Sequence, residues 1–287
     1  MRSTRIGLVA AAAVLGLGLS ACGSDSGDSG SDGGSGDDGG SSESIKIGIK
    51  FDQPGLGLKQ GNDYTGFDVD VATYVAEQLG YSADAIEWVQ APSAQRETLI
   101  QTDQVDLVVA TYSITDERAQ KISFAGPYFI AGQDLLVSAD SDITGPDDLD
   151  GKKLCSVTGS TSAQKVKDQV PGVNLQEFGT YSECVAALNS GTIDAVTTDD
   201  TILAGYAAQE QYAGKLKVVG QTFSEENYGI GLKKDDTELC QQVTDAINKM
   251  IEDGEWQTFV DDNLGPAGYT PPAGNPPTPE PSSRPDR

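Results

Sequence analysis

A run of hydroxyl and charged residues follows a buried-looking apolar segment, and its spacing suits the binding of a carboxylate. Residues 105–110 predict a strand, and residues 115–118 predict a helix start, because a hydroxyl N-cap and two acids suit free N–H donors. Ligands of open α/β sheets bind at the carboxyl ends of strands. Arg118 could therefore bind a carboxylate bidentately beside the hydroxyls of Thr111 and Ser113. The alternative is a surface arginine in an i,i+4 ion pair.

The composition excludes several classes of function. The 287 residues are enough for two lobes, and 44 acidic against 19 basic residues give a net charge of −25. That charge argues against nucleic acid or anionic lipid as a partner. The absence of histidine removes Ser-His-Asp and Cys-His catalysis and the commonest ligand of zinc, iron and copper. Without a phosphate loop or a dinucleotide fingerprint, we expect a protein that is not an enzyme and that holds no cofactor or metal.

The N-terminus predicts export. Residues 1–21 form a signal peptide, with two arginines before an apolar stretch that is too short for a comfortable membrane span. The Leu-Ser-Ala-Cys sequence that ends at Cys22 resembles a bacterial lipobox, in which the cysteine is lipidated after cleavage. The alternative is a plain secretory signal that happens to contain a cysteine. Residues 22–44 would then be the lipidated cysteine and a flexible tether of Gly, Ser and Asp. We expect an extracytoplasmic protein that is anchored to the cell membrane.

The rest of the chain alternates strand and helix patterns. Residues 45–50 alternate like a strand, and a helix with one apolar face begins near Phe67 and ends at Gly80. The acids Asp68 and Asp70 are interpreted as capping and first-turn residues of that helix, not as catalytic groups. In the second half, residues 158–162 open a helix whose N–H groups suit an anion.

The segments 66–71 (Gly-Phe-Asp-Val-Asp-Val) and 110–118 together resemble the extracellular solute-binding proteins of polar amino-acid ABC transporters. The resemblance extends from about residue 45 to residue 265. It implies a two-lobed α/β fold of the periplasmic-binding-protein type II class, in which each lobe is a mostly parallel sheet flanked by helices and two hinge crossovers join the lobes. Lobe 1 would comprise residues 45–131 and 228–264, lobe 2 residues 132–227, and residues 265–287 a disordered proline-rich tail.

The resemblance also implies a set of ligand contacts. In this family the residues that match Thr111, Ser113 and Arg118 hold the α-carboxylate of an amino acid, and the match of Thr161 touches it as the lobes close. The resemblance assigns Asp199 to the α-ammonium and leaves Asp200 as the cap of the following helix. The alternative role for Asp199 is that same N-cap.

Two further cations indicate the side chain of the ligand. Lys50 ends the first strand and so should point towards the same crevice as Thr111. Arg96 aligns with an arginine that contacts the distal carboxylate in glutamate and aspartate binders. Two cations at the far end of the pocket favour a dicarboxylic amino acid, with L-glutamate first, aspartate second and glutamine third. The alternative is that both are solvated surface charges.

The cysteines agree with export. On the expected fold, Cys155 lies on the first strand of lobe 2 and Cys184 on the helix 181–189 that packs over its sheet. We predict a disulfide between them, and a buried thiol at Cys240 in lobe 1. A metal site is the rival interpretation, which the lack of histidine and of a Cys-x-x-Cys pair weakens.

These features together predict a monomeric substrate-binding lipoprotein that delivers an amino acid to the permease subunits of an ABC importer. Two alternatives remain. One is a dehydratase that acts on small carboxylates, because this fold also supports such lyases, and Asp199 would be its candidate general acid. The other is the ligand-sensing subunit of a receptor.

Overall fold

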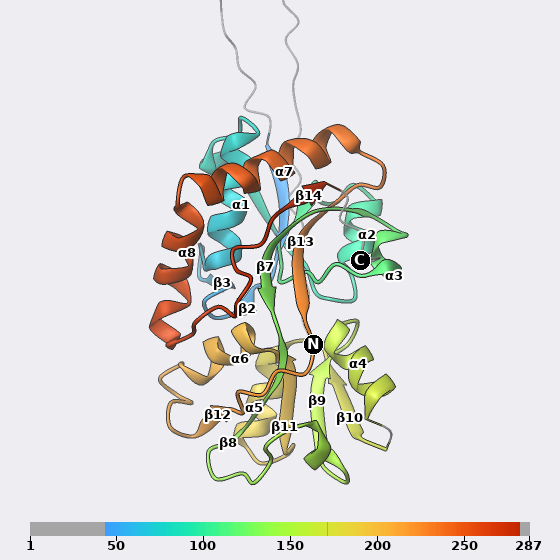
Figure 1. Cartoon of the computed structure of the whole chain (residues 1–287), viewed down its shortest axis with the longest axis vertical. Coiled ribbons are helices and arrows are strands. Elements are labelled where there is room, and N and C mark those ends of the chain that lie inside the picture. Colours follow the sequence, from blue (N-terminus) through green and yellow to red (C-terminus); the bar gives the residue numbers. More distant parts are fainter. Residues whose placement is uncertain (1–43, 171, 282–287) are drawn as a thin grey trace, which may run out of the picture. The chain divides into compact units, whose positions relative to one another are not determined.

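A computed structural model describes residues 44–170 and 172–281, which form two α/β lobes (Figure 1). The predicted signal peptide, the lipidation site Cys22 and almost all of the tether lie outside the described residues. None of the helices in the described part has both the length and the apolar character that a membrane crossing needs.

Lobe 1 is built on a six-stranded sheet in the order β14-β7-β13-β6-β1-β5. Its strands are β1 (Ile45–Ile49), β5 (Ile86–Gln90), β6 (Leu107–Val108), β7 (Ser123–Ala131), β13 (Glu226–Leu232) and β14 (Glu280–Pro281). Its helices are α1 (Phe67–Gln78), α2 (Arg96–Gln101), α3 (Asp116–Ala119), α7 (Thr237–Glu252) and α8 (Glu255–Asn263). The first strand runs parallel to β5 and β6, whereas β13 runs antiparallel to β6 and β7.

Lobe 2 is built on a five-stranded sheet in the order β10-β9-β11-β8-β12. Its strands are β8 (Gln133–Ser138), β9 (Lys153–Val157), β10 (Asn174–Phe178), β11 (Ala195–Asp199) and β12 (Leu216–Val218), and its helices are α4 (Thr161–Gln169), α5 (Tyr181–Asn189) and α6 (Asp200–Ala207). The two-lobed α/β prediction is confirmed, but each sheet is mixed rather than mostly parallel. The reason is that β7, β13 and β8, which carry the chain between the lobes, run against their neighbours.

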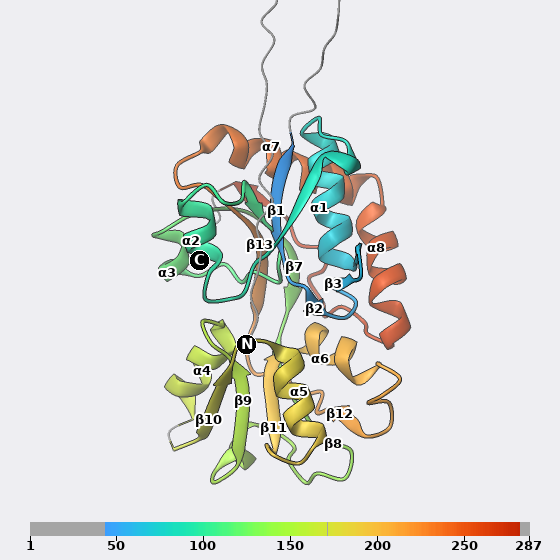
Figure 2. The same cartoon turned by 180° about the vertical axis from the view of Figure 1, so that it is seen from behind.

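Two antiparallel strands of lobe 1 lead to and from lobe 2. The chain leaves through β7, passes Gly132 and enters β8, and it returns through β13 (Figures 1 and 2). Tyr128, Phe129 and Tyr228 are buried on these two strands. Their rings pack with those of Phe67 and Trp256, so the hinge strands are part of the aromatic core of lobe 1.

A small antiparallel sheet lies between β1 and α1. It consists of β2 (Asp52–Gln53), β3 (Gly57–Gln60) and β4 (Asp63–Thr65). This three-stranded sheet, which we call the hairpin, contacts lobe 2. Tyr206 of lobe 2 donates a hydrogen bond to the carbonyl oxygen of Asp52 at 2.5 Å. The contact is tight, since a methyl group added at Gly205 would lie 2.1 Å from the carbonyl oxygen of Pro54.

The segment after α8 corrects our prediction of a disordered tail. Residues 265–281 are described, and the segment contacts hinge strand β7 at Asn275 and at β14. Strand β14 pairs with β7, and the side chain of Asn275 bonds both to the N–H and to the carbonyl oxygen of Ile130. Proline and glycine predict a lack of regular structure, but a sheet edge can still satisfy the backbone of such a segment.

Candidate ligand-binding site

Arg118 lies where the two lobes meet. The Thr115 hydroxyl caps α3 by accepting a hydrogen bond from the backbone N–H of Arg118. The guanidinium donates to the carbonyl oxygen of Ser113 at 2.7 Å in lobe 1 and to that of Gly159 at 3.2 Å in lobe 2. Its Nε lies 3.4 Å from Glu97 Oε1 on α2. Arg118 is only 7% exposed, so it is not the surface residue of the alternative interpretation.

Arg96 is stacked on the same aromatic ring as Arg118. Each guanidinium carbon lies 4.8 Å from the ring centroid of Tyr112. Arg96 is 3% exposed and donates to Ser93 Oγ at 2.9 Å. Burial, and then the charge of Arg118, lowers the pKa of Arg96. The ring partly compensates two cations that would otherwise repel each other in a dry setting.

Lys50 is a third buried cation in this region. It is 2% exposed, its Nζ lies 3.5 Å from Ser93 Oγ, and it lies 5.9 Å from the ring centroid of Tyr181 in lobe 2. Burial, and then the charge of Arg96, lowers the pKa of Lys50 to about 7, against an opposing effect of Asp52. Lys50 and Arg96 are both buried, which contradicts the alternative in which they are solvated surface charges.

Asp199 presents an unpaired carboxylate oxygen at the end of β11. Its Oδ2 accepts a hydrogen bond from the Tyr228 hydroxyl at 2.6 Å, whereas Oδ1 is buried without a hydrogen-bond partner among the described residues. Burial, and then the charge of Glu226, raises the pKa of Asp199. Its side chain makes no capping hydrogen bond to α6, which contradicts the N-cap alternative.

The predicted role of Asp200 as a helix cap is only partly met, because Asp199 takes the N-cap position while Asp200 accepts a hydrogen bond from a first-turn N–H of α6. Asp200 is the first residue of α6, and its Oδ1 accepts hydrogen bonds from the N–H groups of Thr201 and of Gly132, at the crossover between the lobes. The hinge is a long-range partner that helix-capping patterns do not reveal.

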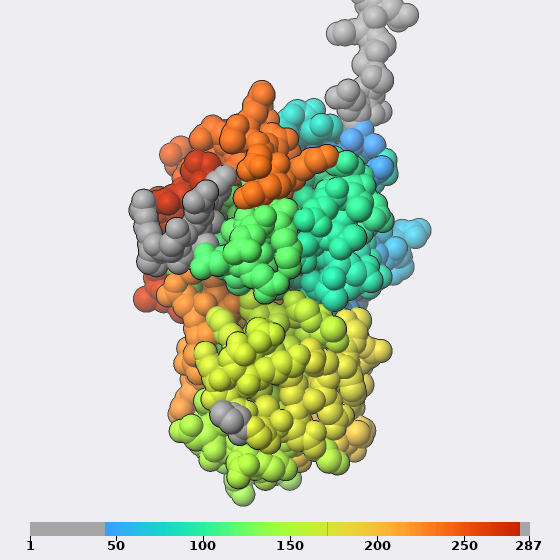
Figure 3. Space-filling view, turned by 90° about the vertical axis from the view of Figure 1, so that its right-hand side faces the viewer, coloured from blue at the N-terminus to red at the C-terminus, as the bar shows by residue number. Residues whose placement is uncertain are grey.

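Three hydroxyl residues complete the predicted set. The Thr111 hydroxyl donates to the carbonyl oxygen of Ala110 at 2.7 Å, and the backbone of Thr111 is left-handed, with φ of 46°. Across the cleft, Ser113 Oγ lies 3.4 Å from the Oγ1 of Thr161, which is the first residue of α4 in lobe 2. The space-filling view shows these neighbouring surfaces of lobes 1 and 2 in contact (Figure 3). The structure thus brings Ser113, Arg118 and Lys50 of lobe 1 into contact with lobe 2, at Thr161, Gly159 and Tyr181. Thr111 and Arg96 are buried in lobe 1, and Asp199 is buried at the end of β11 in lobe 2.

Several polar groups of this region escaped the sequence analysis. Besides Asp199 Oδ1, the buried side-chain atoms without a hydrogen-bond partner in the described residues are Gln53 Nε2, Tyr112 Oη and Gln133 Oε1. An unpaired buried polar group costs about 1–3 kcal/mol, so such a set indicates a missing polar partner. Gln133 is paired with Asp199 in the register of β8 and β11. No sequence pattern indicated Gln53, which lies on the two-residue strand β2.

Asp68 corrects a second capping prediction. It lies in the first turn of α1, as expected, but α1 has no side-chain cap. Instead, Asp68 is fully buried and accepts hydrogen bonds from the N–H of Thr111 at 2.8 Å and from the Tyr128 hydroxyl at 2.7 Å. Burial raises the pKa of Asp68 to about 6, although both hydrogen bonds oppose this shift. Asp68 therefore joins the loop that begins at Thr111 to hinge strand β7, which carries Tyr128. Its neighbour Asp70 accepts a hydrogen bond from Asn263.

A cavity of about 480 Å³ opens beside Arg118, between the lobes. Of the predicted ligand residues, Arg118 and Thr161 line it, together with Ser93 and Gly159. The other predicted residues lie outside its lining: Lys50, Arg96, Thr111, Ser113 and Asp199. Within the described residues, no group of three or more His, Cys, Asp or Glu side chains could hold a metal ion.

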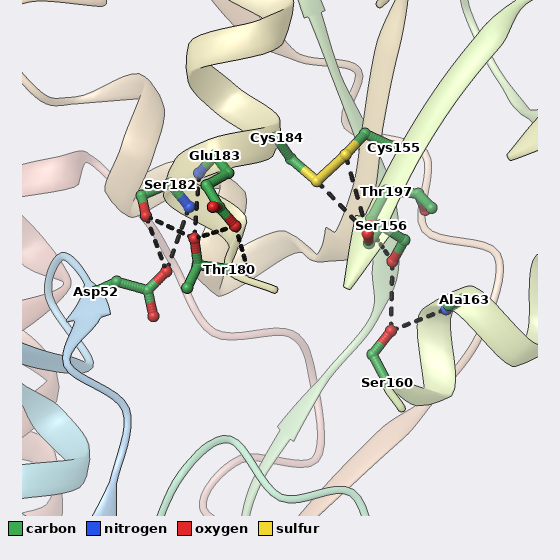
Figure 4. Close-up of a disulfide and its surroundings, with 10 residues drawn as sticks. All are labelled: Asp52, Cys155, Ser156, Ser160, Ala163, Thr180, Ser182, Glu183, Cys184 and Thr197. Carbon is green, nitrogen blue, oxygen red and sulfur yellow. Dashed lines mark hydrogen bonds between the residues drawn. A yellow bond between two sulfur atoms is a disulfide. The ribbon is translucent and has the colours of Figure 1, made fainter. Parts of the chain in front are cut away.

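The predicted disulfide is confirmed. Cys155 of β9 is bonded to Cys184 of α5 beneath the sheet of lobe 2 (Figure 4). On the same helix, Thr180 and Glu183 form a capping box, and Ser182 bonds to Asp52 of the hairpin. Cys240 is a buried thiol in lobe 1, and its Sγ donates to the carbonyl oxygen of Phe124.

The sequence was compared with known proteins. Residues 45–266 match the profile of the bacterial extracellular solute-binding proteins, family 3. This chain belongs to that family. The glutamate-binding protein GluB of Corynebacterium glutamicum is 49% identical to it, over 91% of each chain. The ABC transporter glutamine-binding protein GlnH of Bacillus subtilis is 35% identical, over 75% of this solute-binding protein and 78% of GlnH.

Solved structures agree with this placement. An ancestral arginine-binding protein bound to glutamine is 35% identical and has a TM-score of 0.72, over 78% of this chain and 98% of its own. An ancestral amino-acid-binding protein described as a precursor of cyclohexadienyl dehydratase is 30% identical with a TM-score of 0.70, over 77% and 95% of the two chains. The solute-binding protein therefore has the type II two-lobed fold and belongs to an extracytoplasmic family.

Proposed function

We propose that this chain is the substrate-binding lipoprotein of an ABC importer and that it captures L-glutamate between its lobes. The observation that carries the proposal is the set of three buried cations, Lys50, Arg96 and Arg118, where the lobes meet. Among the described residues, these three cations form one ion pair, between Arg118 and Glu97. Buried charges require partners, and a ligand with two carboxylates supplies them.

The α-amino-acid end would bind to groups from both lobes. Arg118 would hold the α-carboxylate bidentately, with the hydroxyls of Ser113 and Thr111, and Thr161 would add a contact from lobe 2. Asp199 would accept the α-ammonium on its unpaired Oδ1. That contact replaces an unpaired buried oxygen with a charge-assisted hydrogen bond, which supports assigning the ammonium here.

Lys50 and Arg96 would hold the distal carboxylate. A glutamine side chain is neutral and would leave these two cations without an anionic partner, and an aspartate side chain is one methylene shorter. We therefore expect the affinity order glutamate, aspartate, glutamine. The relative from Corynebacterium glutamicum is a glutamate-binding protein, which supports glutamate as the first of the three.

Capture would proceed by closure of the lobes. Lobe 1 offers Arg118, Ser113, Thr111, Lys50 and Arg96 to an arriving ligand. The contacts from lobe 2 are available only when the lobes approach, so the ligand binds the closed arrangement better and shifts the equilibrium towards it. The monomeric closed form would then dock on the transmembrane permease subunits, while a lipidated Cys22 keeps it at the membrane.

We propose binding without turnover. A dehydratase would need a general acid, and Asp199 is the candidate because burial raises its pKa. However, Oδ2 accepts the Tyr228 hydroxyl, and Oδ1 is needed for the α-ammonium. Proton NMR of the protein with small carboxylate substrates would reveal turnover. A receptor subunit, the other alternative, would not stimulate ATP hydrolysis by a reconstituted permease complex.

Calorimetry on the mature chain with each of the twenty amino acids tests the proposed ligand. We expect glutamate to bind at least tenfold more tightly than glutamine. Tighter binding of glutamine, or of a basic amino acid, would overturn the assignment to glutamate. Failure of every amino acid to bind would overturn the importer proposal as a whole.

A further inference from the structure

The segment after residue 266, where the match to the family ends, contacts both lobes. Tyr269 packs its ring 6.5 Å from that of Phe129 on hinge strand β7 and donates its hydroxyl to Asp200 Oδ2 at 3.0 Å on α6 of lobe 2. Tyr269 thus joins the end of lobe 1 to the helix that directly follows the ligand residue Asp199.

Asp200 passes this contact on to the crossover. Its Oδ1 accepts the N–H of Gly132 at 3.2 Å, and its own N–H donates to the carbonyl oxygen of Gly132 at 2.8 Å. The backbone is crowded at this point, because a methyl group added at Gly132 would lie 2.7 Å from the side chain of Thr222. The Asp200 carboxylate therefore links Tyr269 to Gly132, the residue that separates β7 from β8.

Asn275 holds the same crossover from the other side. Its Nδ2 donates to the carbonyl oxygen of Ile130 at 2.8 Å, and its Oδ1 accepts the N–H of Ile130 at 2.9 Å. The side chain thus pairs with the edge of β7 as a neighbouring strand would, two residues before Gly132. Further along, β14 pairs with Ala125 and Gly126, so the segment runs beside β7 (Figure 1).

The surface between this segment and lobe 2 is not filled. A cavity of about 490 Å³ lies there, lined by residues 267–270 and by lobe 2 residues that include Asp134, Ala204, Val218 and Thr222. Lobe 2 therefore has room to move against the segment, and the hydrogen bond from Tyr269 to Asp200 is a polar link across that space.

We propose that Tyr269 and Asn275 are positioning residues of the ligand site, which hold the hinge and the start of α6 in the arrangement that presents Asp199 to the ligand. The proposal rests on the proposed function for its ligand but not for its geometry. Opening the lobes at Gly132 carries Asp200 away while Tyr269 stays with Phe129. The hydrogen bond is then lost in the open form, so it stabilises the closed one.

Tyr269→Phe tests the proposal, since it removes the hydroxyl and keeps the ring. Tyr74→Phe is the matched control, because the Tyr74 hydroxyl donates to Asp253 within lobe 1 at 2.7 Å. We expect Tyr269→Phe to raise the rate of glutamate dissociation, measured by stopped flow on the mature chain, about three- to tenfold. The control should stay within about 1.5-fold of the wild type. Equal rates in the two variants would overturn the proposal.

A second measurement needs no ligand. Spin labels at Glu77→Cys on α1 and Asn189→Cys on α5 report the separation of the lobes by pulsed electron resonance. Tyr269→Phe and Asn275→Ala should each raise the population of long distances, and Tyr74→Phe should not. An unchanged distance distribution in both tail variants would overturn the proposal. If the wild-type chain binds no amino acid, the proposed function fails while this measurement still decides the role of the tail.

Discussion

The guanidinium of Arg118 donates to the carbonyl oxygen of Gly159 across the cleft. The arginine assigned to the ligand thus already bonds to lobe 2 at the start of α4, beside Thr161. A ligand carboxylate at this point would interact with a group that belongs to lobe 1 and touches lobe 2. Ligand binding and lobe closure therefore share one side chain.

Arg118→Ala should weaken glutamate binding by about two to four decades, or about 3–5 kcal/mol, because a buried carboxylate would lose its partner. Calorimetry measures the change. Lys249→Ala is the control, because Lys249 is exposed on α7 of lobe 1 and forms an ion pair with Asp253 outside the lining of the cavity beside Arg118. A loss below fivefold for Arg118→Ala would contradict its assignment to the α-carboxylate.

Lys50→Met should reduce the preference for glutamate over glutamine by about tenfold or more, since it removes one of two cations proposed for the distal carboxylate. Competition binding with both amino acids gives the ratio. Lys59→Met is a matched change at an exposed lysine that lies over Phe51 and Tyr64. An unchanged ratio in Lys50→Met would place the distal carboxylate elsewhere.

Lys50 should take up a proton when the ligand binds above pH 7. Its pKa is lowered to about 7 by burial and by Arg96, so the amine is largely neutral at pH 8 without ligand. A bound carboxylate favours the charged form and raises that pKa. Calorimetry at pH 8 in two buffers of different ionisation enthalpy measures the net protons. Burial raises the pKa of Asp199, and an ammonium bound there favours the carboxylate, so Asp199 should release protons to the buffer on binding. The test is therefore the difference between the two chains: net proton exchange should shift towards release in Lys50→Met.

The same pKa shift predicts how folding stability depends on pH without ligand. Between pH 7 and pH 10.5 the unfolded chain binds more protons at Lys50 than the folded chain does. The contribution of Lys50 to the free energy of unfolding should therefore rise with pH in this window. Urea titrations at pH 7.5 and 9.5 should show this rise in the wild type and a smaller one in Lys50→Met.

Asp68→Asn should weaken glutamate binding about tenfold, since the N–H of Thr111 would lose its charged acceptor and the loop its anchor to Tyr128. Asp70→Asn is the control from the same helical turn. The pKa of Asp68 is raised to about 6, so the folded chain binds the extra proton between pH 3.8 and pH 6. This contribution to stability should fall as pH rises through that window, and the dependence should be absent in Asp68→Asn.

Replacing Cys155 and Cys184 by alanine should lower the free energy of unfolding of lobe 2 by about 3–4 kcal/mol on the chain-entropy account. The two residues are 29 positions apart. Urea unfolding followed by circular dichroism measures the loss, and Cys240→Ala provides a control in lobe 1. A loss below about 1 kcal/mol would show that the loop is already constrained without the bond.

Local patterns predicted much of this architecture. The Thr115 cap, the strand that precedes it and the apolar face of α1 are decided by residues within a few positions of one another. The position of Arg118 beside a strand end followed because strand ends gather on one edge of a sheet, whereas its role as a ligand residue came from the resemblance to the family and stays a prediction. The pairing of Cys155 with Cys184 needed only the assignment of one cysteine to a strand and the other to the helix that covers it.

Longer-range partners were not predictable in this way. Asp68 has the position and residue type of a first-turn acid, and only the fold brings the N–H of Thr111 to it from 43 residues away. Asp200 was assigned as a cap for the same reason. The tail from 265 to 281 has a composition that is typical of disorder, yet Asn275 finds a strand edge to pair with. Composition indicates that a segment lacks regular secondary structure of its own, but it does not show whether the segment packs against another part of the chain.

The contact of Gly205 with Pro54 has a consequence for how such proteins diversify. With no room for even a methyl group, the side-chain size at this position limits how closely the two halves can approach. A bulkier residue would act as a wedge between the lobes without replacing any of the side chains proposed to bind the ligand. The affinity for the solute would then change while the selectivity among solutes stays the same.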